Sequence, residues 1–319
     1  MFSFLKKMRQ LIKTMKAKKG LWFSLLTAIS ISGITIFMYI LTTMTESVKV
    51  EVYDSISETY NSKFDRILID KNKAYKDIVT SLKSDKILLK NLGNNNKKFL
   101  NKKEKELNNL FSLKNDKFNN IIIGFYSAAD NKTKYRGTIY SILSSKQKIF
   151  GFEQMEDGIF LVYLEPITLN NKFLGIIEVK EKIHTLRNNF LSDNSDSAFL
   201  INKVILTKLN LKTKNNNYKD LLPLYSVNNK AYSNKFYIQI KDHGETNFEK
   251  FLEQKYISDD IYYRTYKKIV DINGGTLGLY VMGEETAKNN GFVTIADKMS
   301  KNVTVVALGL VISILLFMF

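Results

Sequence analysis

The chain has 319 residues, of which 45% are hydrophobic and 25% charged, and its 48 Lys and Arg outnumber 31 Asp and Glu to give a formal net charge of +17. It contains no Cys and two His, which excludes disulfides, thiolate metal sites and a cysteine nucleophile, and argues against a multi-histidine metal centre. The length suffices for about two domains with buried cores.

The positive charge does not favour nucleic acid as a partner. Five of the 48 cationic residues are Arg, the residue best suited to bidentate contacts with phosphates and bases. The remaining lysines are spread along the chain among many Asn, as expected for a solvated surface.

Two uncharged apolar segments lie near opposite ends of the chain. Residues 21–43 form a run long enough to cross a bilayer, and residues 1–20 before it carry seven cations and no acid. Because cationic flanks stay in the cytoplasm, this segment predicts a transmembrane helix with a cytoplasmic basic N-terminus. A cleaved signal peptide is the alternative, but the TTMTES that follows lacks a small-residue cleavage site.

The second apolar segment, 303–319, is at the lower length limit for a spanning helix. Two spans predict a multi-pass protein of the cell inner (plasma) membrane, with residues 44–302 in the periplasm or outside the cell.

Residues 44–118 show helical periodicity. Apolar side chains that recur every three, four or seven residues predict a long stalk helix that continues to Gly93. These side chains are Val52, Ile56, Tyr60, Phe64, Ile67, Ala74, Ile78 and Leu82. A second helix is expected from Lys97 to about Lys117. One small domain cannot cover so long a rod, so we expect it to pair with a second copy in a homodimer.

The periodicity then changes to that of strands and predicts an α+β fold. Two hairpins of similar form, LEPITLNNKFLGIIEV and KKIVDINGGTLGLYV, indicate two copies of one antiparallel-sheet module, at 119–194 and 195–300. The predicted strands are 121–126, 159–164, 173–179, 198–205, 235–240, 262–271 and 276–282.

Three segments carry a family resemblance: FSLKNDKFNNIIIGFYSAADNKTKYR at 111–136, GFEQMEDGIFLVYLEPI at 151–167 and LGIIEVKEKI at 174–183. With the long helix before them, they resemble the double Cache sensory domains of bacterial sensor kinases, chemoreceptors and diguanylate cyclases, in particular the double sensory domain of two-component sensor kinases. The resemblance implies two PAS-like modules, membrane-distal and then membrane-proximal, which sense an extracytoplasmic ligand and relay its binding through the membrane helices.

The chain also departs from that family pattern. Phe125, Tyr126 and Ser127 stand where the family often has His and Pro, and Leu161 replaces a basic residue. The identity of the ligand therefore does not transfer.

Arg136 is the foremost candidate for ligand binding. A guanidinium in a pocket can hold a carboxylate in a bidentate, charge-assisted pair, which favours a carboxylate-bearing or amino-acid-like small molecule. The alternative is a structural ion pair with Asp130 or Glu153.

Seven other residues are candidate ligand contacts, each with a structural alternative. Asp130 and Thr133 can serve as turn or cap residues, aromatic residues can belong to the core, and Glu153 can pair with Arg136. Because residues alternate along a strand, Tyr163 and Glu165 share one face of it. The seven are Tyr126, Asp130, Thr133, Tyr140, Glu153, Tyr163 and Glu165.

No hydrolase, P-loop, metalloprotease or dinucleotide motif is present, so we expect no enzyme, no cofactor and no metal site. The function predicted is a transmembrane receptor that acts on a cytoplasmic signalling module in cis or in trans. The chain carries no such output domain, and its end inside the second span favours a truncated receptor. A membrane-anchored structural or assembly protein that holds partners along the helical rod is the alternative.

Overall fold

The computed structural model describes residues 2–113, 121–130, 136–191, 195–202, 221–223, 253–259, 261–285 and a few single positions between and after these ranges. The chain divides into two compact units. One comprises Met1–Ser55 with Asn289–Phe319, and the other comprises Ile56–Lys288.

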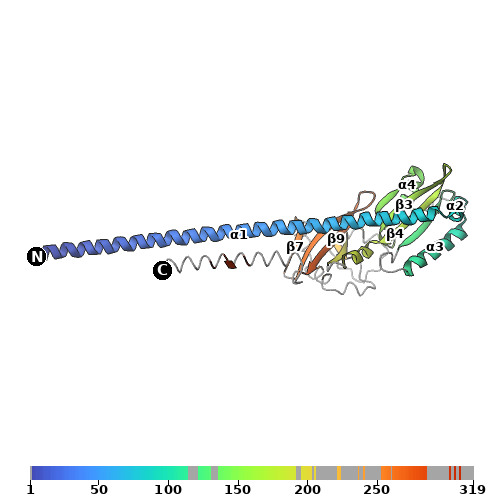
Figure 1. Ribbon diagram of the computed structural model, residues 1–319. Helices are drawn as coiled ribbons and strands as arrows, with labels where there is room; N and C mark the ends of the chain where they lie inside the picture. The colour runs from blue at the N-terminus through green and yellow to red at the C-terminus, as the bar shows by residue number, and fades with distance from the viewer. Residues whose placement is uncertain are drawn as a thin grey trace. The chain divides into compact units, whose positions relative to one another are not determined.

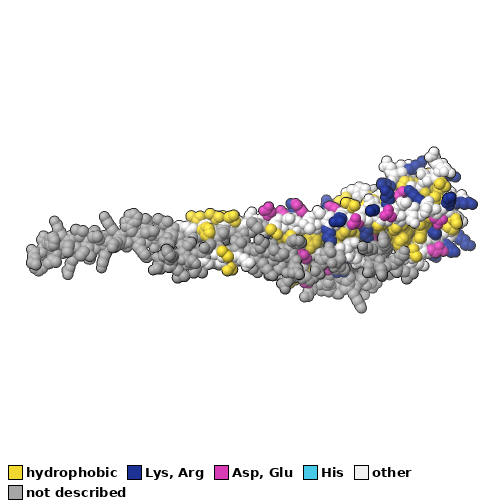
Figure 2. All heavy atoms as spheres, in the orientation of Figure 1, with side chains coloured by type: hydrophobic (Ala, Val, Ile, Leu, Met, Phe, Trp, Pro, Cys, Tyr) yellow, Lys and Arg dark blue, Asp and Glu magenta, His cyan; other side chains and the backbone are white. Residues whose placement is uncertain are grey.

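Helix α1, Phe2–Lys83, includes the first predicted span, 21–43. The described side chains of this part are exposed, and Figure 2 shows their hydrophobic members together on the helix; they include Ile36, Phe37, Tyr39, Ile40 and Met44. Among the residues that the structure describes, no helix combines the length and hydropathy needed to cross a membrane. The second predicted span, 303–319, lies outside the described residues except at three positions.

Within the unit Ile56–Lys288, α1 buries one face. Ile56, Tyr60, Phe64 and Ile67 are buried as their spacing predicts. Further along, Leu82 is also buried as predicted, but Tyr75 and Val79 are buried where the predicted stripe passed through their neighbours Ala74 and Ile78. The buried face of the helix is thus displaced by one residue at this level. The Tyr75 ring makes an edge-to-face contact with Phe150 of the sheet, with 6.3 Å between the ring centroids, and so keeps Tyr75 on the buried face.

The predicted continuation of α1 to Gly93 is wrong, because the helix ends at Lys83. Asp85 begins α2, Lys86–Gly93, by accepting a hydrogen bond from the Leu88 amide at 2.9 Å. The break after Gly93 is confirmed, and α3 follows at Lys97–Leu113. Helix α2 packs on strand β4 (Lys172–Lys182), and α3 packs on strand β1 (Ile122–Ser127) (Figure 1).

The first sheet, called sheet A, has the strand order β1-β4-β3-β2 and is antiparallel throughout. Its strands are β1 (Ile122–Ser127), β2 (Ile149–Met155), β3 (Gly158–Leu169) and β4 (Lys172–Lys182). Helix α4, Gly137–Ser145, covers one face, here called the α4 face, with Ile139 and Ile142 on Val162 and Leu164. Helix α1 packs on the opposite face.

The second sheet, called sheet B, has the order β6-β5-β9-β8-β7 and is also antiparallel. The 3-10 helix η2 (Ile183–Arg187) and helix α5 (Asn188–Leu191) precede it. Its strands are β5 (Asp196–Asn202), β6 (Leu221–Pro223), β7 (Tyr256–Ser258), β8 (Tyr262–Val270) and β9 (Thr276–Glu285). An α+β fold with two antiparallel sheets is therefore confirmed.

The strand predicted at 235–240 is contradicted at its two described residues, Phe236 and Ile240, which are helical. Both side chains are buried and belong to one cluster with Leu279 and Val281 of β9. Their spacing of four residues places them on the same face of a helix, which explains why both can pack on sheet B.

The two predicted hairpins are confirmed and share a detailed likeness. Each first strand has a register shift near its end, after Ile167 in β3 and after Ile269 in β8. Opposite these residues stand Gly175 and Gly278, and a Cβ on either would lie 2.2 Å or 2.0 Å from a carbonyl oxygen of the neighbouring strand. Only glycine permits that approach at both positions.

Candidate functional site

A charged cluster occupies the α4 face of sheet A. Strand alternation places Tyr126 of β1, Glu153 of β2 and Glu178 of β4 on this face. Arg136 is the residue before the first turn of α4, so the helix positions its guanidinium above the strands. Gly124 makes room for the cluster, because a Cβ there would lie 3.1 Å from Glu178 Oε2 and 3.4 Å from the Tyr126 hydroxyl.

The Arg136 guanidinium contacts three side chains from three strands. Its Nε donates to Glu153 Oε1 at 2.8 Å and its Nη1 donates to the Tyr126 hydroxyl at 3.2 Å. Its Nη2 donates to Glu178 Oε1. The structure thus brings together three of the predicted residues, and of the two ion-pair partners considered for Arg136 it selects Glu153.

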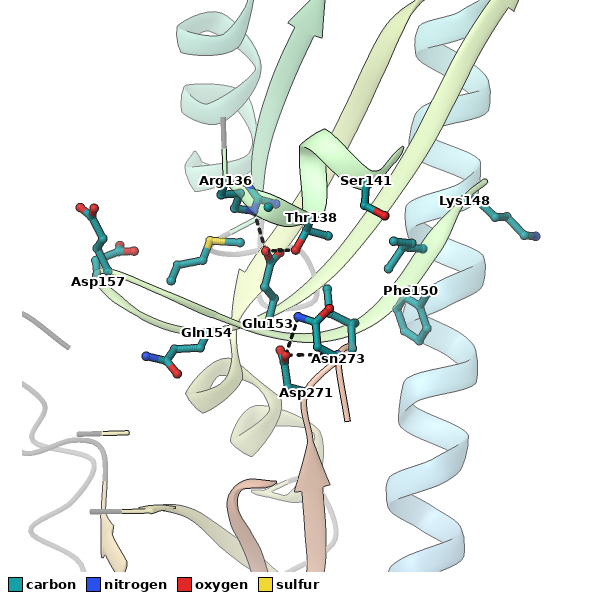
Figure 3. A pocket seen from close by; sticks show the side chains of 15 residues that line it. Arg136, Thr138, Ser141, Lys148, Phe150, Glu153, Gln154, Asp157, Asp271 and Asn273 are labelled. Carbon is teal, nitrogen blue, oxygen red and sulfur yellow. Dashed lines mark hydrogen bonds and ion pairs between the residues drawn. The ribbon is translucent and has the colours of Figure 1, made fainter. Parts of the chain in front are cut away.

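Further hydrogen bonds complete the cluster. The Tyr126 hydroxyl donates to Glu178 Oε2 at 2.8 Å. Thr138 Oγ1 donates to Glu153 Oε1 at 2.5 Å, as Figure 3 shows. Lys180 Nζ lies 3.2 Å from Glu178 Oε2. Two carboxylates are therefore held by two cations and two hydroxyls.

Burial makes these contacts strong. Glu153 is 5% exposed and Glu178 is 0% exposed, so neither charge could be kept in the folded protein without its partners. Burial alone would lower the pKa of Arg136, but the Glu178 and Glu153 carboxylates raise it above its ordinary value. Burial and the Glu178 carboxylate raise the pKa of Tyr126, which keeps its hydroxyl protonated as a donor.

A cavity of about 1040 Å³ lies beside this cluster. Arg136, Thr138 and Ser141 line it from α4, Glu153 lines it from β2, and the β8–β9 turn lines it from sheet B; the turn residues are Asp271, Ile272 and Asn273 (Figure 3). Volumes of this size suit small organic ligands.

The β8–β9 turn reaches the cavity through backbone contacts with β2. The Ile272 amide donates to the Phe152 carbonyl at 2.8 Å. A Cβ at Gly151 would lie 2.7 Å from Ile272 Cγ2, so glycine is needed for this close approach. Both sheets therefore contribute residues to one cavity.

The other predicted ligand contacts of the segment 126–140 either lie away from the Arg136 cluster or fall outside the described residues. Asp130 pairs with Lys97 of α3 at 2.7 Å. The ion pair between Asp130 and Arg136, which was one structural alternative, is therefore not formed. Tyr140 is 54% exposed on α4 and does not line the cavity. Thr133 lies outside the described residues.

Tyr163 and Glu165 share one face of β3, as predicted, but it is the face opposite the Arg136 cluster. The Tyr163 hydroxyl donates to Glu165, and Lys83 of α1 pairs with the same carboxylate. Burial opposes ionisation of Glu165, yet hydrogen bonds from Lys83 and Tyr163 lower its pKa below the usual value. These residues join sheet A to α1 and are not placed at the cavity.

Three residues at this site were not predicted from the sequence: Glu178, Thr138 and Asp271. Glu178 is the acidic residue of LGIIEV, within the hairpin segment that resembles the Cache family. A single carboxylate in the otherwise uncharged run FLGIIEV signals a buried partner, because an unpaired buried charge is too costly to retain. That signal was sufficient to include Glu178 among the candidate site residues.

A smaller cavity, of about 390 Å³, lies between α3 and β1. Glu104 accepts a hydrogen bond from the Phe125 amide at 2.7 Å, and Asn108 accepts one from the Ile123 amide at 2.7 Å. Burial raises the pKa of Glu104. These side chains satisfy the free edge of β1, which protects an exposed strand edge from pairing with another chain.

Within the described ranges, no three His, Cys, Asp or Glu side chains gather as a metal site would require. No protein-family model matches the chain. No curated protein matches it either.

Among solved structures, the chain is similar to the ligand-binding domain of Mlp24 with asparagine, with 11% identity and a TM-score of 0.33 over 82% of this chain and 99% of that one. It is also similar to the ligand-binding domain of the Pseudomonas aeruginosa amino acid chemoreceptor PctC in complex with GABA, with 13% identity and a TM-score of 0.21 over 49% of this chain and 64% of that one. Because both TM-scores are low, we base the function on the geometry of this chain.

Proposed function

We propose that this protein is a transmembrane receptor that binds a small molecule outside the cytoplasm. Its sensory region is of the double Cache type, and helices at 21–43 and 303–319 anchor it in the cell membrane. Ligand binding shifts α1 and thereby signals to a cytoplasmic module in the same chain or in a partner. We expect the receptor to act as a homodimer.

The observation that carries this proposal is the cavity of about 1040 Å³ beside Arg136 and Glu153. A cavity with a few convergent polar groups is the usual form of a small-molecule site.

The membrane part of the proposal is supported by the exposed apolar side chains of α1 between Ile36 and Met44. Large contiguous apolar patches are uncommon on proteins that lie wholly in water. The basic residues of 1–20 support an N-terminus in the cytoplasm, and the proposal accordingly has the unit Ile56–Lys288 outside it.

The relay is supported by the contacts that α1 makes with both sheets. Lys71 pairs with Glu181 of sheet A at 2.8 Å. Ser57 and Thr265 of sheet B share a buried hydrogen bond of 2.6 Å. A ligand that changes either sheet therefore acts on one continuous helix, with a typical coupling of about 1–3 kcal/mol.

The test is thermal unfolding of the full chain in detergent against a metabolite panel that includes asparagine and GABA. A ligand at about 100 times its dissociation constant stabilises the folded state by about 2.7 kcal/mol. Replacing Ser141, which lines the cavity, with Trp fills the space and abolishes the shift. Ser144→Trp is the matched control, because Ser144 is an exposed residue of the same helix that does not line the cavity.

Two results contradict the proposal. If no member of a broad panel stabilises the chain, the protein is not a small-ligand receptor, and a structural role becomes the better account. If a ligand stabilises the Ser141→Trp variant as much as the unsubstituted chain, the protein binds it at another site.

A further inference from the structure

We propose that the cavity beside Arg136 selects a ligand through an ammonium group, which the Glu153 and Asp271 carboxylates accept. This inference rests on the proposed function and specifies the chemical class of its ligand. It also departs from the expectation that Arg136 binds a carboxylate.

The first observation is the charge of the cavity wall. Its lining contains two basic side chains, Arg136 and Lys148, against four acidic ones, Glu153, Glu156, Asp157 and Asp271. The chain as a whole carries a net charge of +17. An acidic wall on a basic protein concentrates cations at this place and disfavours anions.

The second observation is a buried carboxylate oxygen that lacks a partner. Glu153 is 5% exposed, and its Oε1 already accepts from Arg136 and Thr138. Its Oε2 is buried and has no hydrogen-bond partner within the described part of the chain. A buried acceptor without a donor is costly, so a ligand that supplies the donor gains affinity there.

Asp271 presents the same feature from the β8–β9 turn. Its Oδ2 accepts from the Asn273 backbone amide at 3.2 Å and from Asn273 Nδ2 at 2.8 Å (Figure 3). Its Oδ1 is buried and, among the residues described, has no donor. Two such acceptors in one cavity suit a ligand that carries ammonium groups, each of which offers three donors.

A carboxylate is the weaker candidate for the same cavity. The Arg136 guanidinium already contacts Glu153, Glu178 and Tyr126, so an incoming carboxylate would compete with these partners. It would also meet the Glu153 charge, which lies 2.8 Å from Arg136 Nε. In Figure 3 the Lys148 side chain points away from Glu153 and so does not offset that repulsion.

The test is calorimetric titration of the full chain in detergent with three four-carbon probes that differ only in their end groups. These are 1,4-diaminobutane, 4-aminobutanoate and succinate. We expect the diamine to bind most tightly and to exceed succinate by about tenfold or more, as a charge-assisted hydrogen bond implies.

Two substitutions and a control locate the contact. Glu153→Gln keeps the oxygen that accepts from Arg136 but removes the charge, and weakens diamine binding by about tenfold. Asp271→Asn keeps the acceptor for the Asn273 amide and weakens diamine binding by a similar factor. If the Glu153 variant fails to fold, the Asp271 variant alone tests whether the diamine binds at this cavity. Glu106→Gln is the control, because Glu106 is an exposed residue of α3 outside the cavity lining.

The inference is overturned if succinate binds as tightly as the diamine, if neither amine probe binds, or if folded Glu153 and Asp271 variants retain full affinity. Failure of the amines alone leaves the receptor proposal intact when another member of the metabolite panel binds. Failure of the whole panel contradicts both.

Discussion

Removal of the Arg136 guanidinium is the perturbation with the largest expected effect on stability. In Arg136→Met the side chain keeps much of its apolar length but loses three hydrogen bonds, two of which are also ion pairs. Glu153 and Glu178 then remain buried, and Lys180 is the cation left beside Glu178 in the described part of the cluster.

The magnitude follows from the burial of the two carboxylates. Breaking a buried ion pair by removing one partner costs about 3–5 kcal/mol. The Arg136 side chain is 24% exposed, so the lower end, about 3 kcal/mol, applies. For a unit of this size, that loss lowers the melting temperature by roughly 6–12 °C.

The assay is thermal unfolding of the full chain followed by circular dichroism. Arg136→Lys keeps the charge but not the planar fork, and is expected to lose about half as much stability. The triple variant with Met at 136 and Gln at 153 and 178 removes the unpaired charges and recovers most of the loss. Arg66→Met, at an exposed position of α1, is the matched control.

A change of less than about 1 °C in Arg136→Met would refute this reasoning, because it would mean that the two carboxylates do not depend on the guanidinium. The reasoning would also be refuted if the triple variant were no more stable than Arg136→Met.

Three further predictions concern the scaffold. Gly175→Ala places a Cβ 2.2 Å from the Tyr126 carbonyl oxygen, and denaturant unfolding should show a loss of about 3 kcal/mol, whereas Gly275→Ala, which meets open space, should change stability little. Asp85→Ala removes the N-cap of α2 and should cost about 1 kcal/mol in the same assay, and no loss would contradict the capping role. Burial lowers the pKa of His184 from 6.5 to about 4, so the unfolded chain takes up a proton first as the pH falls. Stability should therefore be lost between pH 6.5 and 4, by about 2 kcal/mol after allowance for partial exposure, and His184→Gln should flatten that part of the profile.

The hairpins were predictable because their turn chemistry is local. Asn170 and Asn171 adopt the positive φ angles of 49° and 62° that a two-residue turn requires, and Gly274 has a φ of +90°. Helix α4 and strand β2 were missed. Each is a short segment in which the positions of the apolar residues follow from the surface it packs against and do not form a repeating pattern.

The candidate site was predictable in part. The proximity of Arg136 to Glu153 was among the alternatives that the sequence allowed. Glu178 joins them only because β4 lies between β1 and β3 in sheet A, and that strand order is not encoded in any short motif. Alternation placed Tyr163 and Glu165 on one face of β3, but periodicity does not reveal which face α1 covers.

The side of the membrane on which the unit Ile56–Lys288 lies is the most direct test of the receptor account. The chain has no native Cys, so one thiol can be introduced at Lys105, an exposed residue of α3, and another at Lys16 in a separate variant. A membrane-impermeant maleimide should label position 105 in intact cells and label position 16 only after lysis. Shielding of position 105 until lysis would contradict the account.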